Sequence, residues 1–177
     1  ISATAERDRV TARMEQSLAS SDDGFMLVEQ GGHLAFANDA VRAIFQAPDC
    51  DWKSGTDFSD NWRSYLEFIA VLERPISDEL KSLDLPALAE LKKGREFELP
   101  DGRSIFFKAR TLKDGGIVAS VTDITARLHA QNLLSQRLAA IEATKDGILI
   151  CDDEGRITYI NAAGAELMGF GSSGNAY

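Results

Sequence analysis

The sequence nearly repeats itself over a separation of 123 positions. Residues 23–40 and 146–163 share an Asp-Gly pair, an apolar run, a glycine turn and a closing aromatic-x-Asn. The matched pairs are Asp23 with Asp146, Gly24 with Gly147, Gly32 with Gly155, and Asn38 with Asn161. Self-similarity at a fixed spacing indicates consecutive modules of one kind. The chain is therefore expected to hold one complete module and the opening of a second.

Composition excludes several classes of protein. A length of 177 residues suits one domain, or one domain plus a fragment of a longer protein, and the repeat favours the second. The net charge of −9 argues against a nucleic-acid partner, because that binding depends on clustered Lys and Arg. The longest apolar run, 147–151, is only strand-sized, so no membrane contact of this fragment is expected. Cys50 and Cys151 lack CxxC spacing, which argues against zinc and disulfides and favours a cytoplasmic location.

Hydrophobic periodicity predicts the order of secondary structure. Val10, Met14 and Leu18 form one apolar stripe, which indicates a helix over 5–19. Alternation and turn residues predict five strands, at 25–30, 33–37, 96–99, 103–112 and 117–122. Short helices are expected within 48–94, and a helix of about twenty residues is expected from Asp123. Because hairpin-length links join only antiparallel neighbours, this order predicts an α+β fold with an antiparallel sheet.

Asn38 and Asn161 each stand between a strand and a helix. At that position a side-chain oxygen is expected to cap the free N–H groups of the first turn. The predicted parts of the chain are an N-terminal flanking helix at 1–20, a complete domain at 21–123, a signalling linker helix at 124–146 and the truncated start of a second domain at 147–177. The last part is too small to bury a core alone, so we expect it to be disordered, packed on a neighbour or paired with another chain.

The long strand at 103–112 has two different faces. Alternation places Ile105, Phe107 and Ala109 on one face and Phe106, Lys108 and Arg110 on the other. The first face is expected to point to the core and the basic pair away from it. Phe106 then needs cover on the outer face, for which the helix at 5–19 is available.

Three short motifs occur in a fixed order along the chain. They are Phe36-Ala37-Asn38, repeated as Tyr159-Ile160-Asn161; Leu99-Pro100-Asp101-Gly102-Arg103; and Thr122-Asp123-Ile124-Thr125. In this order the motifs resemble the PAS (Per-Arnt-Sim) sensory domain family, over 20–125 and again, for the opening of the fold only, over 141–170. The resemblance implies a PAS fold from a bacterial signal-transduction protein: a five-stranded antiparallel sheet with short helices on one face, flanked by N- and C-terminal helices.

The resemblance also implies candidate functional residues. An interior that holds a small ligand would be lined by Leu27, Phe36, Ile44, Trp62, Tyr65, Phe68, Phe107 and Val118. Asp123 and Thr125 match the Asp-x-Thr junction that in the family ties the sheet edge to the exit helix, so they are predicted to relay the signal. The alternative is that Asp123 only caps the first turn of that helix. Apolar steps close to the coiled-coil spacing predict a dimer seam on that helix, formed by Ile124, Leu128, Leu134, Leu138 and Ile141.

The cofactor remains unassigned, and two kinds are disfavoured. Family members that bind haem usually offer a histidine from the helical middle, and residues 38–95 contain none. Covalent flavin attachment uses an Asn-Cys-Arg-Phe motif, whereas Cys50 is flanked by carboxylates that disfavour a thiolate. His129 lacks the acidic residue and downstream proline of a kinase phosphorylation box, so a solvated histidine is expected. No catalytic or metal-binding residue is predicted, since no phosphate loop, GxSxG or HExxH is present.

Two hypotheses of function remain open. The first is a non-catalytic sensory module that binds a small ligand or dimerises, and signals through its C-terminal helix to an effector in the same chain. That effector is expected to be a histidine kinase of a two-component system or a cyclic-di-GMP enzyme such as a diguanylate cyclase. The alternative is a pure dimerisation scaffold with a filled core and no ligand. A self-contained enzyme is the weakest reading, because no catalytic signature is found.

Overall fold

A computed structural model describes residue 13 and residues 16–47 and 50–170. The chain separates into two compact units, Ile1–Thr125 and Ala126–Tyr177. Residues 16–19 are helical, as expected for the end of the N-terminal helix, whereas Val10 and Met14 of its predicted stripe lie outside the described residues. No helix in the described ranges is long and apolar enough to cross a membrane.

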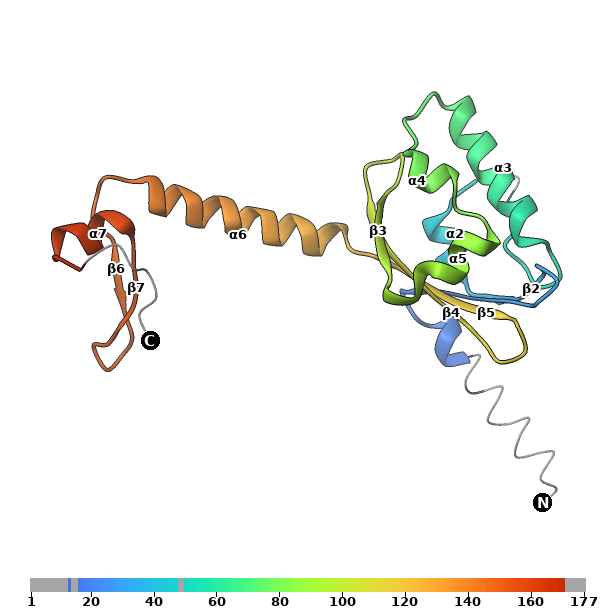
Figure 1. The fold of residues 1–177 in the computed structure, drawn as a ribbon, viewed down its shortest axis with the longest axis horizontal. Helices are drawn as coiled ribbons and strands as arrows, with labels where there is room; N and C mark the ends of the chain where they lie inside the picture. Colours follow the sequence, from blue (N-terminus) through green and yellow to red (C-terminus); the bar gives the residue numbers. More distant parts are fainter. Residues whose placement is uncertain (1–12, 14–15, 48–49, 171–177) are drawn as a thin grey trace, which may run out of the picture. The chain divides into compact units, whose positions relative to one another are not determined.

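The first unit consists of one antiparallel sheet with short helices on one of its faces (Figure 1). Its strands are β1 (Gly24–Val28), β2 (Leu34–Ala37), β3 (Arg95–Glu98), β4 (Ser104–Thr111) and β5 (Ile117–Asp123). They are arranged in the order β2-β1-β5-β4-β3. The helices between β2 and β3 are α2 (Asp39–Ile44), α3 (Phe58–Val71), α4 (Asp78–Lys81), α5 (Leu85–Glu90) and the 3₁₀ turn η1 (Leu91–Lys93). The predicted α+β fold and five-stranded sheet are confirmed.

The helical face of the sheet forms the core. Alternate residues of β1, β4 and β5 are buried, such as Ile105, Phe107 and Ala109 of β4, which confirms the predicted inner face of β4. An aromatic cluster fills the space between sheet and helices; its members are Phe45, Trp52, Phe58, Trp62, Tyr65 and Phe107. Neighbouring rings have centroids 5.3–6.4 Å apart, within the range at which aromatic pairs attract each other.

The outer face of the sheet carries the other half of each strand. Lys108 and Arg110 lie on this face, as predicted, since they alternate with the buried residues of β4. The Phe106 ring lies over Gly94, so close that a Cβ atom there would be 2.1 Å from its Cζ. Phe106 therefore has cover from the residue before β3, a contact that the strand pattern did not predict.

The second unit contains an ordered copy of the opening of the first. It comprises most of α6 (Thr125–Ala143), a hairpin of β6 (Leu149–Cys151) and β7 (Ile157–Ile160), and α7 (Ala162–Leu167). Residues 149–167 form a hairpin and a helix, and packing of this part on a neighbour or pairing with another chain stays a prediction. Turn and capping bonds of the hairpin hold this segment together, for example from the amide of Asn161 to the carbonyl of Ile148 at 3.0 Å.

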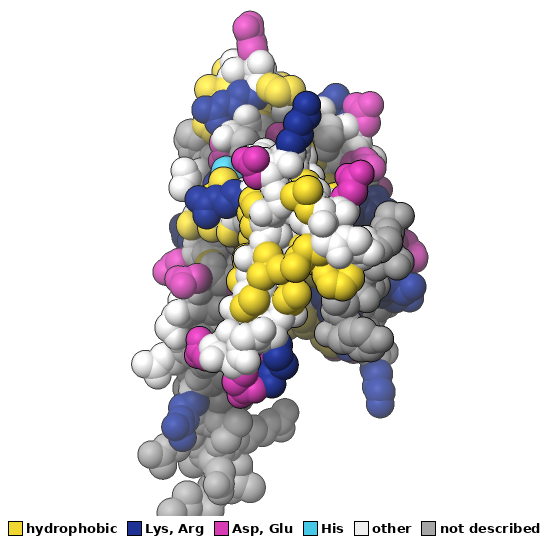
Figure 2. Space-filling view, turned by 90° about the vertical axis from the view of Figure 1, so that its left-hand side faces the viewer, with side chains coloured by type: hydrophobic (Ala, Val, Ile, Leu, Met, Phe, Trp, Pro, Cys, Tyr) yellow, Lys and Arg dark blue, Asp and Glu magenta, His cyan; other side chains and the backbone are white. Residues whose placement is uncertain are grey.

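The two copies differ in how their hairpins are covered. Met26 and Leu34 are 2% and 1% exposed, whereas their counterparts Leu149 and Ile157 are 39% and 40% exposed. Figure 2, which looks from the left-hand side of Figure 1, shows hydrophobic side chains gathered on the surface. In the first unit β5 and the helices cover the equivalent face, and the described part of the second unit has no such elements.

Candidate functional site

The junction between β5 and α6 is tied by side-chain hydrogen bonds. The Thr125 hydroxyl donates to Asp123 Oδ1 at 2.6 Å and accepts from the Ser104 amide at 2.9 Å. The Thr125 amide donates to the same Asp123 oxygen at 2.9 Å, and the Ile124 amide donates to the Ser104 carbonyl at 2.8 Å. The last residue of β5, the first residue of α6 and the start of β4 are thus linked through one hydroxyl group.

The charge of Asp123 is maintained by these contacts. Partial burial acts to raise the pKa of Asp123, but the hydrogen bonds from the Thr125 hydroxyl and amide, with the nearby Arg103 cation, outweigh burial and lower the pKa below its usual value. Asp123 is therefore a carboxylate at neutral pH, and it accepts the bonds that fix the start of α6.

Arg103 connects this junction to the rest of the first unit. Its guanidinium donates to the Ile44 carbonyl at the end of α2 at 2.7 Å and to Asp101 at 2.7 Å. It also lies 3.8 Å from Asp123. Two hollows of the first unit share this side chain: a cleft of about 570 Å³ and a second one of about 430 Å³ that Asp123 also lines.

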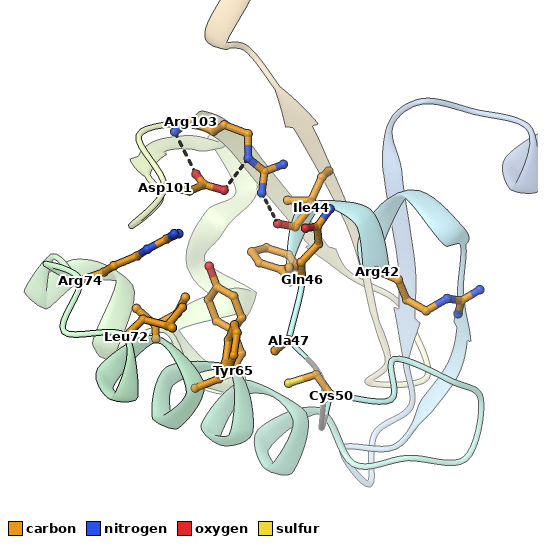
Figure 3. Close-up of a pocket in the computed structure, with 13 residues that line it drawn as sticks. Arg42, Ile44, Gln46, Ala47, Cys50, Tyr65, Leu72, Arg74, Asp101 and Arg103 are labelled. Carbon is orange, nitrogen blue, oxygen red and sulfur yellow. Dashed lines mark hydrogen bonds and ion pairs between the residues drawn. The ribbon is translucent and has the colours of Figure 1, made fainter.

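The larger cleft lies between the end of α2, the helix α3 and the turn from β3 to β4 (Figure 3). Its polar side includes Arg42, Arg74, Asp101 and Arg103, and its apolar side includes Phe45, Phe68, Ile69 and Leu72. Figure 3 shows the Tyr65 hydroxyl and the Arg74 side chain pointing into the same space. Arg42 instead points away from the middle of the cleft, where it pairs with Asp39 and donates to the Trp52 carbonyl at 3.1 Å.

Of the eight predicted pocket residues, five line the larger cleft or belong to the core. Ile44, Tyr65 and Phe68 line the larger cleft. Trp62 and Phe107 are buried in the aromatic cluster of the core.

The remaining three predicted pocket residues require a correction. Leu27, Phe36 and Val118 lie side by side on the outer face of the sheet, because Leu27 pairs with both Phe36 and Val118 in register. Their neighbours along β1 and β5 are the buried ones, and Val118 is 41% exposed. Residues directly opposite each other on neighbouring strands share a face of the sheet, so all three side chains point away from the helices. The sequence could have shown this for Leu27, which alternates with Met26 and Val28.

The predicted dimer helix is largely exposed. Leu134 and Leu138 are 59% and 45% exposed, and Leu128 and Ile141 are half-buried. The prediction that Ile124 belongs to the dimer seam was wrong. Ile124 precedes α6, is only 4% exposed and belongs to the first unit, so it is not free to join a helix seam.

Asn38 and Asn161 hold equivalent positions in the two units. Both cap the following helix as predicted. Their amide nitrogens make further bonds that capping did not predict. Asn38 donates to the carbonyls of Leu18 and Asp23 at 2.7 and 2.8 Å. Asn161 makes the equivalent bonds to Ile141 and Asp146 at 3.0 and 2.9 Å. Each asparagine therefore anchors the helix that leads into its own unit, and for Asn161 that helix is α6.

The last turn of α6 makes two further contacts. Glu142 accepts from the Tyr159 hydroxyl at 2.6 Å and from the Ala162 amide at 3.0 Å. Hydrogen bonding to Glu142 raises the pKa of Tyr159 to about 12, so this phenol remains a donor at neutral pH. Among the described residues, no group of three His, Cys, Asp or Glu side chains lies together as metal ligands do.

Family comparison agrees with this architecture. A family model described as a PAS fold matches residues 18–132, more than half of the chain. The chain belongs to the PAS family. A second family model, described as a PAS domain, matches residues 136–176, which include the hairpin of the second unit. PAS domains are generally non-catalytic sensory modules, and the chain is accordingly a sensory signalling module.

Solved PAS domains with a similar arrangement are distant in sequence. The PAS domain of an HTR-like protein from Haloarcula marismortui is 12% identical with a TM-score of 0.35, and the match covers 68% of this chain and 97% of that one. The PAS domain of Bordetella pertussis BvgS is 15% identical with a TM-score of 0.44, covering 77% and 98%. The PAS domain of nitrogen regulation protein NR(II) from Vibrio parahaemolyticus is 14% identical with a TM-score of 0.32, covering 62% and 96%. No curated protein matched the sequence.

Proposed function

We propose that the first PAS unit senses a small ligand in the larger cleft and passes the response through Asp123 and Thr125 to α6. The supporting observation is the position of Arg103, whose side chain lines the cleft and lies 3.8 Å from Asp123. A ligand that draws Arg103 toward the cleft weakens its attraction for Asp123. The hydrogen bonds that fix the start of α6 then change with the occupancy of the cleft.

The output of this response is a change in a homodimer. The exposed Leu134 and Leu138 lie on one side of α6 with Ile141, at the spacing that a partner helix covers in a coiled coil. The parts at 1–20, 21–123, 124–146 and 147–177 then act as flanking helix, sensor, linker helix and the start of the next PAS domain. The effector is a histidine kinase or a cyclic-di-GMP enzyme of the same bacterial, cytoplasmic protein.

The second candidate function is a dimerisation scaffold without a ligand. The aromatic cluster favours it, since Trp62 and Phe107 are 4% and 0% exposed and packed against other rings. Protein interiors of this kind are filled to the density of organic crystals. A scaffold of this type keeps the helix seam and needs no cleft.

Native mass spectrometry of protein purified from cells separates the two functions. A reproducible bound mass, with a matching thermal shift from that compound, is expected for a sensor. No bound mass, and no shift across a metabolite panel, favours the scaffold.

Sedimentation measurements test the dimer, which both functions require. Replacing Leu134 and Leu138 together with glutamate should convert the dimer to a monomer, since it places charges in the seam. Leu133→Glu is the matched control, because Leu133 is 48% exposed on a different side of the same helix. A monomeric parent protein at high concentration would contradict the dimer.

A further inference from the structure

The larger cleft of the first unit carries an excess of positive charge. Among the residues that the structure describes, three arginines and one carboxylate line it: Arg42, Arg74, Arg103 and Asp101. Arg42 is paired with Asp39 and points away from the middle of the cleft, so Arg74 and Arg103 account for the excess. The whole chain has a net charge of −9, so the sign of this local excess is opposite to that of the protein. A cleft with such an excess attracts anions from solution.

Arg74 is the cation with the fewest contacts. Arg103 is held by Asp101 and the Ile44 carbonyl, and Arg42 is held by Asp39. Within the described ranges, by contrast, no carboxylate or carbonyl forms an ion pair or hydrogen bond with Arg74. Arg74 comes shortly after the end of α3 in the sequence, and its side chain points into the cleft (Figure 3). Arg74 therefore has its hydrogen-bond donors free for a ligand.

Tyr65 supplies a second donor beside Arg74. Tyr65 is only 3% exposed, and its hydroxyl points into the cleft without a hydrogen-bond partner among the residues described. Burial, and then the nearby Asp101 carboxylate, raise the pKa of Tyr65 to about 12. The phenol is therefore protonated at neutral pH and can donate one hydrogen bond.

Apolar side chains also line the cleft. Phe68 and Ile69 belong to α3, Leu72 is the C-cap of that helix, and Phe45 adds an aromatic ring. The volume of about 570 Å³ lies within the range of roughly 300–1,000 Å³ that small-molecule sites have. A purely inorganic anion leaves these apolar side chains without a contact.

We propose that the cleft binds a small organic anion, a carboxylate or phosphate monoester with a short apolar body. Arg74 and the Tyr65 hydroxyl hold the anionic group next to Arg103, and the body lies against Phe68 and Leu72. This ligand class rests on the proposed sensory function. An anion beside Arg103 competes with Asp123 for the guanidinium, so binding would shift the Arg103 side chain.

Calorimetric titration of the whole chain tests this ligand class with probes that share one ring. Phenylacetate and phenyl phosphate carry the anion, 2-phenylethanol is neutral, and inorganic phosphate lacks the body. Saturable binding is expected for one or both aromatic anions, at least about 10-fold tighter than for the alcohol, because a hydrogen-bonded charge contributes about 1.5–3 kcal/mol. Inorganic phosphate should bind at least about 10-fold more weakly than phenyl phosphate.

Three variants assign the binding to the cleft. Arg74→Gln is expected to weaken the bound anion at least about 10-fold, and Tyr65→Phe about 2- to 10-fold. Arg63→Gln is the control for loss of one positive charge from α3, since Arg63 pairs with the exposed Asp60 and does not line the cleft. It should change the affinity less than about 2-fold, as expected for a screened surface charge.

Two results would overturn the inference: equal affinity for alcohol and anions, or an equal effect of Arg74→Gln and Arg63→Gln. The proposed sensory function has a separate outcome. A neutral compound that copurifies, and whose affinity Arg74→Gln leaves unchanged, overturns the anionic ligand and retains the sensor. The absence of both a copurifying compound and anion binding overturns both.

Discussion

Replacing Asn38 with alanine is expected to destabilise the first unit by about 3 kcal/mol, because this one side chain joins three segments. Its amide group bonds the carbonyls of Leu18 and Asp23 at 2.7 and 2.8 Å, and its oxygen accepts from the Phe25 amide at 2.9 Å. Each short bond contributes about 1 kcal/mol net. The fourth bond, from the Val41 amide, is 3.4 Å long and adds little. Asn38 is 3% exposed, so water does not readily replace these partners.

Tryptophan fluorescence during urea unfolding is a suitable assay, since both tryptophans of the chain, Trp52 and Trp62, belong to the first unit. A loss of about 3 kcal/mol lowers the urea midpoint by about 2 M, at a slope near 1.5 kcal/mol/M. Asn132→Ala removes an exposed asparagine of α6 and should change stability by less than about 0.5 kcal/mol.

The second asparagine makes the same assay more discriminating. Asn161→Ala should leave the tryptophan transition in place, because its partners Ile141, Asp146, Ile148 and Gly164 all belong to the second unit. Hydrogen exchange of 147–168 should accelerate instead. A loss below about 1 kcal/mol in Asn38→Ala would show that this side chain does not join the three segments. So would a shift of the tryptophan transition in Asn161→Ala equal to that of Asn38→Ala.

Two further predictions concern single positions. Gly94→Ala should lower the free energy of unfolding by at least about 2 kcal/mol, because the residue has φ 78° and its new Cβ would meet the Phe106 ring. Gly102→Ala is the control, since Gly102 has φ 86° but open space around it. In urea unfolding it should lower the free energy by only about 1 kcal/mol. Because the pKa of Asp123 is lowered on folding, its charge stabilises the fold above its unfolded pKa and the effect is lost as pH falls through the folded pKa. The difference in urea midpoint between the parent and Asp123→Asn should therefore be constant from pH 5 to 8 and shrink below about pH 4. An equal cost for both glycines, or a difference that persists undiminished at pH 3, would contradict these two arguments.

The helices and strands were predicted from the sequence more accurately than the residues that line the cleft. Strand alternation placed Phe107 and Lys108 on the correct faces because it depends only on local geometry. The capping roles of Asn38 and Asn161 were likewise local. Their bonds to Leu18 and Ile141 were not predictable, because each crosses about twenty residues and depends on how a helix docks.

The cleft could not have been assembled from motifs. Arg42, Arg74 and Arg103 are far apart in the sequence and belong to no common pattern, so only the packing of α2, α3 and the β3–β4 turn brings them to one hollow. Leu27 and Val118 were misplaced for a different reason. Apolar residues also occur on the outer face of this sheet, where Val118 is 41% exposed, so apolar character alone does not identify the ligand side.

Amide hydrogen exchange measures whether the Thr125 hydroxyl holds the start of α6, as signalling from the first unit to this helix requires. Thr125→Val keeps the shape of the side chain and removes the hydroxyl that links Asp123 with the Ser104 amide. Exchange of the Ser104 amide and of the amides at 124–128 should accelerate at least about 5-fold, the effect of about 1 kcal/mol. Thr122→Val, the same change three residues earlier, should leave these amides unchanged. Equal protection in the two variants would show that this junction does not hold the helix.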